Sequence, residues 1–228
     1  NGVGLSISSG GNIAIKRNKV HDNSGQGISV YTYGYSDGSV AQLSIHNNDV
    51  TGNGLDASSY YGNNVGLYIE GNAITSIIGN TINHNGAGVF INNYDANSND
   101  NFDLTDNIIT NNQGYGISVN GYAKPVISNN DIVGNEGYAL ENHTSFALNA
   151  KNNWWGEDNS AEINESSNPK ALSFIYDGYN DGSAGKVNYS GWLSASHVSG
   201  GGSISDTTTG QLSLTDSSGI VVPTYQAG

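Results

Sequence analysis

The chain has 228 residues, enough for one sizeable domain or one elongated repeat unit. Its 20 acidic residues outnumber 7 basic residues, and the formal net charge of −13 argues against nucleic acid or an anionic membrane as partner, because both are bound by clustered Lys and Arg. Cysteine is absent, which excludes disulfides and thiolate metal sites and fits a secreted protein. No apolar run has the length of a membrane span and no signal-peptide pattern is present, so we expect no membrane insertion.

The chain contains 34 asparagines and 32 glycines, and this composition indicates its secondary structure. Both form helices poorly and are typical of turns, so we expect strands rather than helices along most of the chain. Between the turns, apolar residues alternate in short segments, as in strands with one buried face. In chain order the inward pairs are Leu5/Ile7, Ile13/Ile15, Ile28/Val30, Leu43/Ile45, Leu67/Ile69, Thr75/Ile77, Val89/Ile91, Phe102/Leu104, Ile117/Val119, Pro125/Ile127 and Leu148/Ala150.

An asparagine recurs at one place in every copy of this pattern: Asn18, Asn48, Asn80, Asn107, Asn130 and Asn153, with a second asparagine five residues later in the first five copies. Short strands cannot bury an apolar face alone, but copies stacked at about 4.8 Å per rung can. The amide can donate to one neighbouring rung and accept from the other, and Asn tolerates the left-handed backbone of a sharp corner. We therefore predict a solenoid with a structural Asn ladder; a β-sandwich would not keep this register.

The last copy reads KNNWWG, and Trp155 stands where earlier copies have an aliphatic residue. We expect Trp155 in the core or cap, and Trp154 to point outward, where it could also stack on a sugar. The segment Asn152–Gly156 and the Asp/Gly-rich segment of residues 175–193 resemble the endings of right-handed parallel β-helix repeats of the pectate-lyase-like superfamily, in particular its secreted and periplasmic Asn-rich members. The resemblance covers about residues 1–193 and implies an all-β, right-handed, single-stranded parallel β-helix.

Residues 194–228 are rich in Ser, Thr and Gly and predict a linker followed by a short β-hairpin or strand, with Gly219–Pro223 as one edge strand. The first residues begin in the middle of the repeat, without an amphipathic helix over the first rung. A solenoid needs such a cap. We therefore expect either a longer protein or end-to-end stacking of copies into a homo-oligomer or filament, in which the open edge pairs with a strand such as Gly219–Val222 of a partner.

Segments that lengthen a rung beyond 23 residues mark candidate ligand sites: residues 31–42, 54–65 and 92–101. The first and third leave the same corner. The outward residues of the strands before that corner are Ser6, Ser29, Tyr68, Phe90, Ser118 and Glu141. Aromatic rings pack on sugar C–H groups and carboxylates bind hydroxyls, so we predict a polysaccharide or cell-surface glycan as ligand. The candidate contacts are Tyr31, Tyr33, Tyr35, Tyr68, Glu70, Phe90, Tyr94 and Asp95; alternatively, the loop tyrosines only pack over the coil.

A calcium site is a second candidate. Asp95, Asn97, Asn99, Asp103 and Asp106 partly match the ligand spacing of a hard-cation loop. However, Asp100 stands where such a loop requires glycine, and Phe102/Leu104 alternate as in a strand. Solvated acidic loops are the alternative. We expect no other cofactor.

Enzyme chemistry is a third possibility, because many members of the superfamily that the chain resembles cleave, epimerise or de-esterify uronic-acid polymers. A lyase would need a basic residue and cations at the substrate carboxylate, yet Lys16, Arg17 and Lys19 lie together on the first rung. A hydrolase would need two carboxylates, for which Glu70 with Asp95 or Asp37 are conceivable. No residue matches the active-site patterns of that family.

The sequence therefore favours a non-catalytic extracellular or cell-surface module that is structural or adhesive and binds carbohydrate or self-associates. A polysaccharide lyase, hydrolase or epimerase is the first alternative, and a subunit of a filament stacked end to end is the second.

Overall fold

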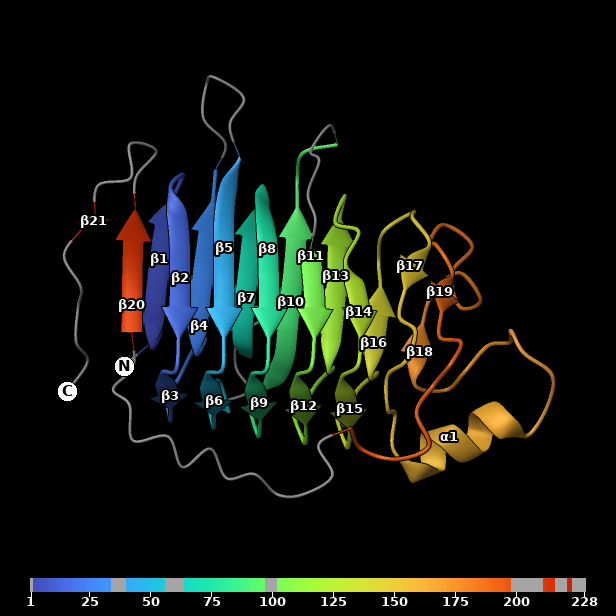
Figure 1. Ribbon diagram of the computed structural model, residues 1–228. Helices are drawn as coiled ribbons and strands as arrows, with labels where there is room; N and C mark the ends of the chain where they lie inside the picture. Colours follow the sequence, from blue (N-terminus) through green and yellow to red (C-terminus); the bar gives the residue numbers. More distant parts are fainter. Residues whose placement is uncertain are drawn as a thin grey trace.

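The computed structural model describes residues 2–33, 40–55, 64–96 and 102–197, together with the backbone of residues 211–215 and 221–222. These residues form a solenoid in which the chain passes in turn through three sheets, here called A, B and C (Figure 1). Neighbouring rungs pair in parallel throughout, with like positions in register. The predicted parallel solenoid is confirmed.

Sheet A contains, in spatial order, β1 (Leu5–Ser9), β4 (Ile28–Thr32), β7 (Val65–Gly71), β10 (Ala87–Asn93), β13 (Ile117–Gly121), β16 (Leu140–Asn142) and β18 (Ile175–Tyr176). Sheet B contains β19 (Val187–Asn188), β17 (Leu148–Asn149), β14 (Val126–Ser128), β11 (Phe102–Thr105), β8 (Ala73–Ile78), β5 (Ala41–His46), β2 (Asn12–Lys16), β20 (Gln211–Thr215) and β21 (Val221–Val222). Sheet C contains β15 (Asp131–Val133), β12 (Ile108–Thr110), β9 (Thr81–Asn83), β6 (Asp49–Thr51) and β3 (Lys19–His21).

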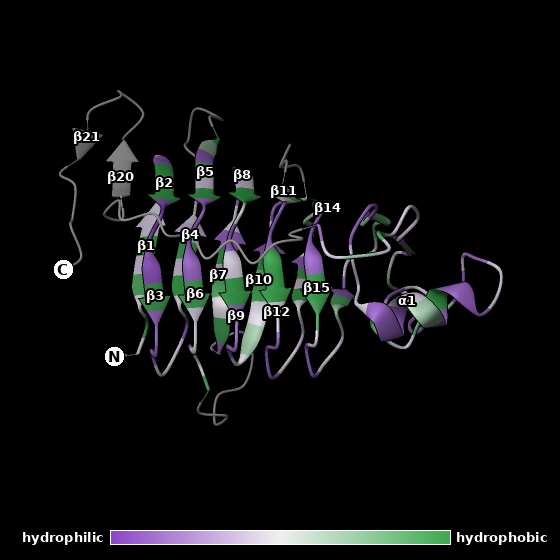
Figure 2. Cartoon of the chain, turned by 60° about the horizontal axis from the view of Figure 1, so that its bottom comes forward, coloured by the Kyte–Doolittle hydropathy of each residue, from purple (hydrophilic) through white to green (hydrophobic). Residues whose placement is uncertain are grey.

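The core is one continuous column of aliphatic side chains between the three sheets. Each strand contributes its inward residues, so Ile15, Ile45 and Ile77 on successive rungs of sheet B are all fully buried. Hydrophobic residues lie mainly in the strands, whereas most of the turns are hydrophilic (Figure 2). Because one rung cannot bury its own inner face, stacking is what removes this apolar surface from water.

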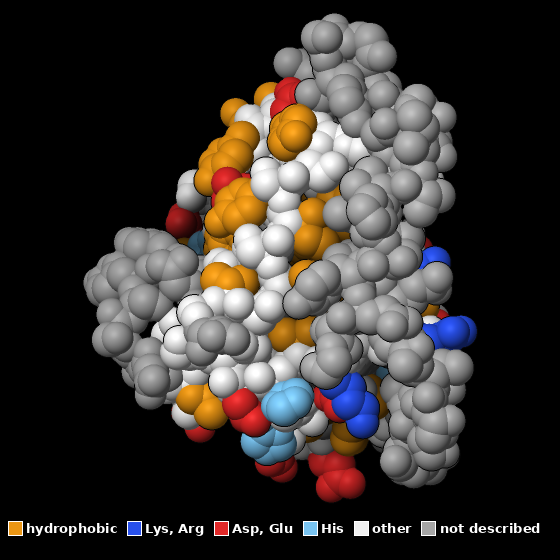
Figure 3. Space-filling model, turned by 90° about the vertical axis from the view of Figure 1, so that its left-hand side faces the viewer, with side chains coloured by type: hydrophobic (Ala, Val, Ile, Leu, Met, Phe, Trp, Pro, Cys, Tyr) orange, Lys and Arg blue, Asp and Glu red, His pale blue; other side chains and the backbone are white. Residues whose placement is uncertain are grey.

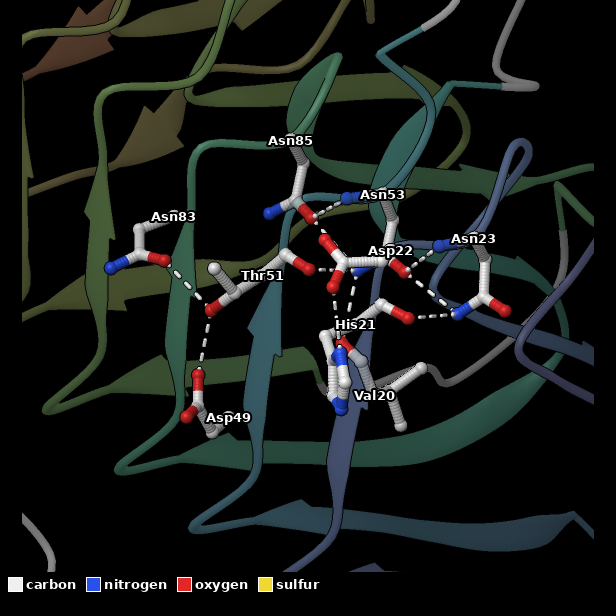
Figure 4. Close-up of polar contacts among 9 residues, drawn as sticks. All are labelled: Val20, His21, Asp22, Asn23, Asp49, Thr51, Asn53, Asn83 and Asn85. Carbon is white, nitrogen blue, oxygen red and sulfur yellow. Dashed lines mark hydrogen bonds and ion pairs between the residues drawn. The ribbon is translucent and has the colours of Figure 1, made fainter.

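Asparagines build two ladders, one at each corner that flanks sheet C. In both, the side-chain oxygen of one Asn accepts the backbone N–H and the Nδ2–H of the Asn on the preceding rung; for Asn107 the donor is Asn80, at 2.9 Å for both bonds. Nδ2 of Asn107 donates to Asn130 and to the carbonyl of Ile77. The second ladder is formed by Asn23, Asn53, Asn85, Asn112 and Asn135, of which Figure 4 shows the first three.

The ladder asparagines are not the residues with left-handed backbone, contrary to the prediction. Among the described residues, positive φ falls on the residue before each ladder Asn. These residues are Arg17, Asn47, Gly79, Asp106, Asn129 and Asn152 at one corner, and Asp22, Gly52, His84, Asn111 and Gly134 at the other. The turn residue points outward and can vary, whereas the next residue must direct its amide into the stack.

The C-terminal end differs from the repeat. Helix α1 (Glu157–Asn164) follows Trp155 and buries one residue, Ile163. The indole of Trp155 is fully buried, with its ring centroid 5.6 Å from that of Phe174. Trp154 is partly buried, and its main chain forms a bridge with Asp131 of β15. The large indole thus ends the aliphatic column where the cross-section changes.

Two described parts of the chain after residue 193 contact the solenoid at different places. Ser196 Oγ and His197 Nδ1 contact the buried carboxylate of Asp131, at 2.5 and 2.7 Å. Farther on, β20 pairs antiparallel with β2, and β21 pairs with β20 (Figure 1). The strand beside the first rung is therefore Gln211–Thr215, and Val221–Val222 lies one strand farther out. Figure 3 shows this end of the molecule, where hydrophobic side chains remain exposed; Val3 is 39% exposed.

Candidate functional site

The candidate glycan surface lies on the outer face of sheet A, over β4, β7 and β10. The strand register places Ser29, Tyr68 and Phe90 in one outward column, and Tyr31, Glu70 and Asn92 in the next. Both columns end at the corner where the chain passes from sheet A to sheet B. Alternation along the strands is what directs these side chains away from the aliphatic core.

The outward rings form a stack. The ring centroids of Tyr68 and Phe90 are 5.0 Å apart with an interplanar angle of 8°, and those of Tyr31 and Tyr68 are 5.4 Å apart at 43°. Parallel rings at this distance cover one face of each other, so Tyr68 and Phe90 each have one face against the neighbouring ring. The stack therefore stabilises the sheet, and the neighbouring ring occupies one of the two faces of each of these predicted contact residues.

Tyr68 also holds Glu70 in place, because its hydroxyl donates a hydrogen bond to the carboxylate. Burial, and then the neighbouring Glu70, raise the pKa of Tyr68 far above its ordinary value, so the hydroxyl remains a donor at any physiological pH. A carboxylate has about four acceptor positions. Glu70 can therefore still accept hydrogen bonds from a ligand while Tyr68 fixes its orientation.

The rings with free surface stand at the edge of this face. Tyr31 is 39% exposed, Tyr33 56% and Tyr94 68%. Tyr33 packs over the glycine of the turn between β1 and β2, since a Cβ on Gly10 would lie 2.9 Å from its ring. Asp95 lies next to Tyr94 and accepts a hydrogen bond from Asn72 at 3.1 Å. Tyr35 and Asp37 lie outside the described residues.

The predicted calcium ligands are only partly described. Asn97 and Asn99 lie outside the described residues, Asp103 is on β11 and Asp106 is in the turn that follows. The extended strand carries Asp103 on the outer face of sheet B, in register with Ser76 and Val126. Within the part of the chain that the structure describes, no group of three or more His, Asp or Glu side chains could hold a metal ion.

A second polar and aromatic cluster on the outer face of sheet A was not predicted. Glu141 of β16 is in register with Tyr176 of β18, and His143 Nε2 lies 3.2 Å from Glu141 Oε2. The Tyr176 ring lies 4.9 Å from that of His143 and 5.6 Å from that of Tyr138, and its hydroxyl donates to Asp181 at 3.3 Å. Only Glu141 had been recognised as outward, because Tyr176 and Asp181 come from the segment after the repeat.

Comparison with known proteins identifies the architecture. Residues 1–155 match the family model described as a right handed beta helix region. The chain belongs to the right-handed β-helix family. No curated protein and no solved structure matches it. Among the described residues of this β-helix, no helix is long and apolar enough to cross a membrane.

Proposed function

We propose that this β-helix is a non-catalytic extracellular or cell-surface module that binds a neutral polysaccharide at the corner between sheets A and B. The observation that carries the proposal is that Tyr31 is in register with Glu70, whose carboxylate is oriented by Tyr68, and that the exposed rings of Tyr33 and Tyr94 follow β4 and β10 at the same corner. Exposed rings provide surfaces for sugar C–H groups, and the carboxylate accepts hydrogen bonds from hydroxyls.

The stack of Tyr68 and Phe90 has a positioning role in this proposal. Since their faces are in contact, they hold Tyr31 and Glu70 on neighbouring rungs and reduce the entropy lost on binding. The rise of one rung is close to the length of one sugar unit in an extended chain, so successive rungs can meet successive units. The net charge of −13 disfavours a polyanionic chain over so large a surface.

The test compares exposed and stacked rings. Tyr33→Ala, Tyr94→Ala and Glu70→Gln should each weaken binding of a neutral polysaccharide about 5- to 20-fold, as for truncated contact residues. The matched control is Leu55→Ala, because Leu55 is 43% exposed and lies between β6 of sheet C and β7 of sheet A, at a different corner. Glycan arrays would select the ligand and isothermal titration calorimetry would measure affinity. Loss of binding in Leu55→Ala, or unchanged binding in all three corner variants, would refute the assignment.

Hydrolysis of polysaccharide is a second candidate function, favoured by the cluster at Tyr176. Asp181 accepts a hydrogen bond from the Tyr176 hydroxyl at 3.3 Å, and Glu141 is in register with Tyr176 on the neighbouring strand, so two carboxylates flank this residue. Glycosidases use two such groups on either side of the scissile bond. Release of reducing ends that disappears in both Glu141→Gln and Asp181→Asn would establish this activity, whereas release unaffected by both substitutions would exclude this pair.

A further inference from the structure

A cavity of about 400 Å³ lies at the C-terminal end of the solenoid, beside β19. It is at the end of the solenoid, several rungs along the axis from β4 and β10, after which Tyr33 and Tyr94 come in the chain (Figure 1). Its apolar walls include Tyr179, Trp192 and Pro169, and its polar lining includes Asn168, Asn188 and Lys186. The lining comes mainly from the Asp/Gly-rich segment and the preceding connection, and it includes none of the residues to which the proposed functions assign a role.

Buried hydrogen bonds hold the walls of this cavity. The hydroxyl of Tyr189, itself 3% exposed, donates to Asn168 Oδ1 at 2.9 Å and accepts the backbone N–H of Lys170 at 2.7 Å. On the other side, the Asp177 carboxylate is 2% exposed and accepts the backbone N–H groups of Tyr179 and Val187, at 2.9 and 2.8 Å. The cavity is thus preformed, as small-molecule sites usually are.

The charge at the cavity is unusual for this chain. Lys186 is one of 7 basic residues, and its Nζ lies 4.2 Å from the centroid of the Tyr179 ring. The nearby carboxylate of Asp177 is occupied by hydrogen bonds, because one oxygen accepts the N–H of Tyr179 and the other accepts the N–H of Val187. Aromatic walls, amides and an ammonium group together suit a sugar ring that carries a carboxylate.

We propose that this cavity binds one carboxylate-bearing sugar unit at the end of a glycan chain, with the ring against Tyr179 and the carboxylate beside Lys186. Its volume is at the small end of the range for ligand sites, about 300–1,000 Å³, which suits a terminal unit rather than the interior of a polymer. The site is independent of the corner of Tyr33 and Tyr94, so the module would contact glycans at two places.

The experiment uses pairs of methyl glycosides that differ only in the carboxylate, the glucuronide with the glucoside and the galacturonide with the galactoside, titrated into the full chain by calorimetry. At least one uronide should bind about 5- to 10-fold more tightly than its neutral partner. Lys186→Gln should abolish that preference, and Tyr179→Ala should weaken both members of the pair. Lys151→Gln and Tyr122→Ala are the matched controls, since Lys151 is exposed and neither residue lines the cavity.

Equal affinity for acidic and neutral partners, or a preference that survives Lys186→Gln, would overturn the carboxylate assignment. No binding of any glycoside at millimolar concentration would overturn the site itself. Trp192 is left unchanged because it also packs against the core. Tyr33→Ala and Tyr94→Ala should leave uronide binding intact, so failure of the corner site and failure of this cavity would be observed separately.

Discussion

Replacing one ladder asparagine in the middle of the solenoid should destabilise the protein far more than replacing the first. Asn107 is fully buried, accepts the backbone N–H of Asn80, and donates to the carbonyls of Ile77 and Thr105 and to Asn130. In Asn107→Ala, the Asn80 N–H and the Ile77 carbonyl lose these partners. At about 1–3 kcal/mol for each unsatisfied buried group, the free energy of unfolding should fall by about 2–6 kcal/mol.

Asn18→Ala is the matched control because Asn18 occupies the same ladder on the first rung. It is partly exposed and donates to Lys16 and Asn48. Its loss should cost no more than about 0.5–1.5 kcal/mol, the usual net value of one hydrogen bond. Urea unfolding followed by far-UV circular dichroism would measure both variants. Equal destabilisation by the two substitutions would show that the ladder adds nothing beyond the individual side chain, and would refute the reasoning.

Two further predictions concern the core and the response to pH. Trp155→Ala should lower the free energy of unfolding by about 3–5 kcal/mol. Trp155→Phe should lower it by clearly less, because the buried indole N–H has no partner among the described residues and Phe removes this group. Thermal unfolding would compare the two variants, and an equal loss of stability would contradict this account. Burial, and then Lys16, lower the pKa of His46, so the unfolded chain binds a proton more readily. The stability that depends on a neutral His46 is therefore fully present above the unfolded pKa of about 6.5, and it is lost as the pH falls from there towards the lower pKa of His46 in the folded protein. His46→Gln should flatten the dependence of stability on pH between roughly 7 and 5, and an unchanged profile would rule His46 out.

The architecture could be predicted because the sequence repeats its physical requirements. Alternation selects strands, and the recurrence of Asn at the position of Asn107 or Asn130 selects a stack, since only a neighbouring rung can satisfy a buried amide. The backbone at the corners was assigned to the wrong residue for the same reason. The Asn is the same in every repeat and so forms a recognisable pattern, whereas the residue before it, which has the left-handed backbone, varies among Arg, Asp, His, Asn and Gly.

The candidate sites could be predicted only in part. Register placed Tyr68 beside Phe90, but period-two alternation does not specify a side-chain torsion, so it could not show that the two ring faces cover each other. Tyr176 and Tyr179 come from the segment after the repeat, where no periodicity places a residue on a rung. Helix α1 has a single buried residue and therefore lacks an amphipathic signal.

The stacking that forms the ladders also affects how the protein ages chemically. Asparagine followed by glycine ordinarily deamidates fastest, because the next backbone nitrogen attacks the side-chain amide. In Asn53–Gly54 and Asn85–Gly86 that nitrogen is bound to the preceding rung, at 2.8 Å in both cases, and each amide is held by its neighbours. Asn120–Gly121 has the same dipeptide at the partly exposed C-terminal end of β13. On long storage, isoaspartate should therefore form at Asn120 well before it forms at Asn53 or Asn85. The stacked rungs of the solenoid should then remain intact while this partly exposed residue is modified.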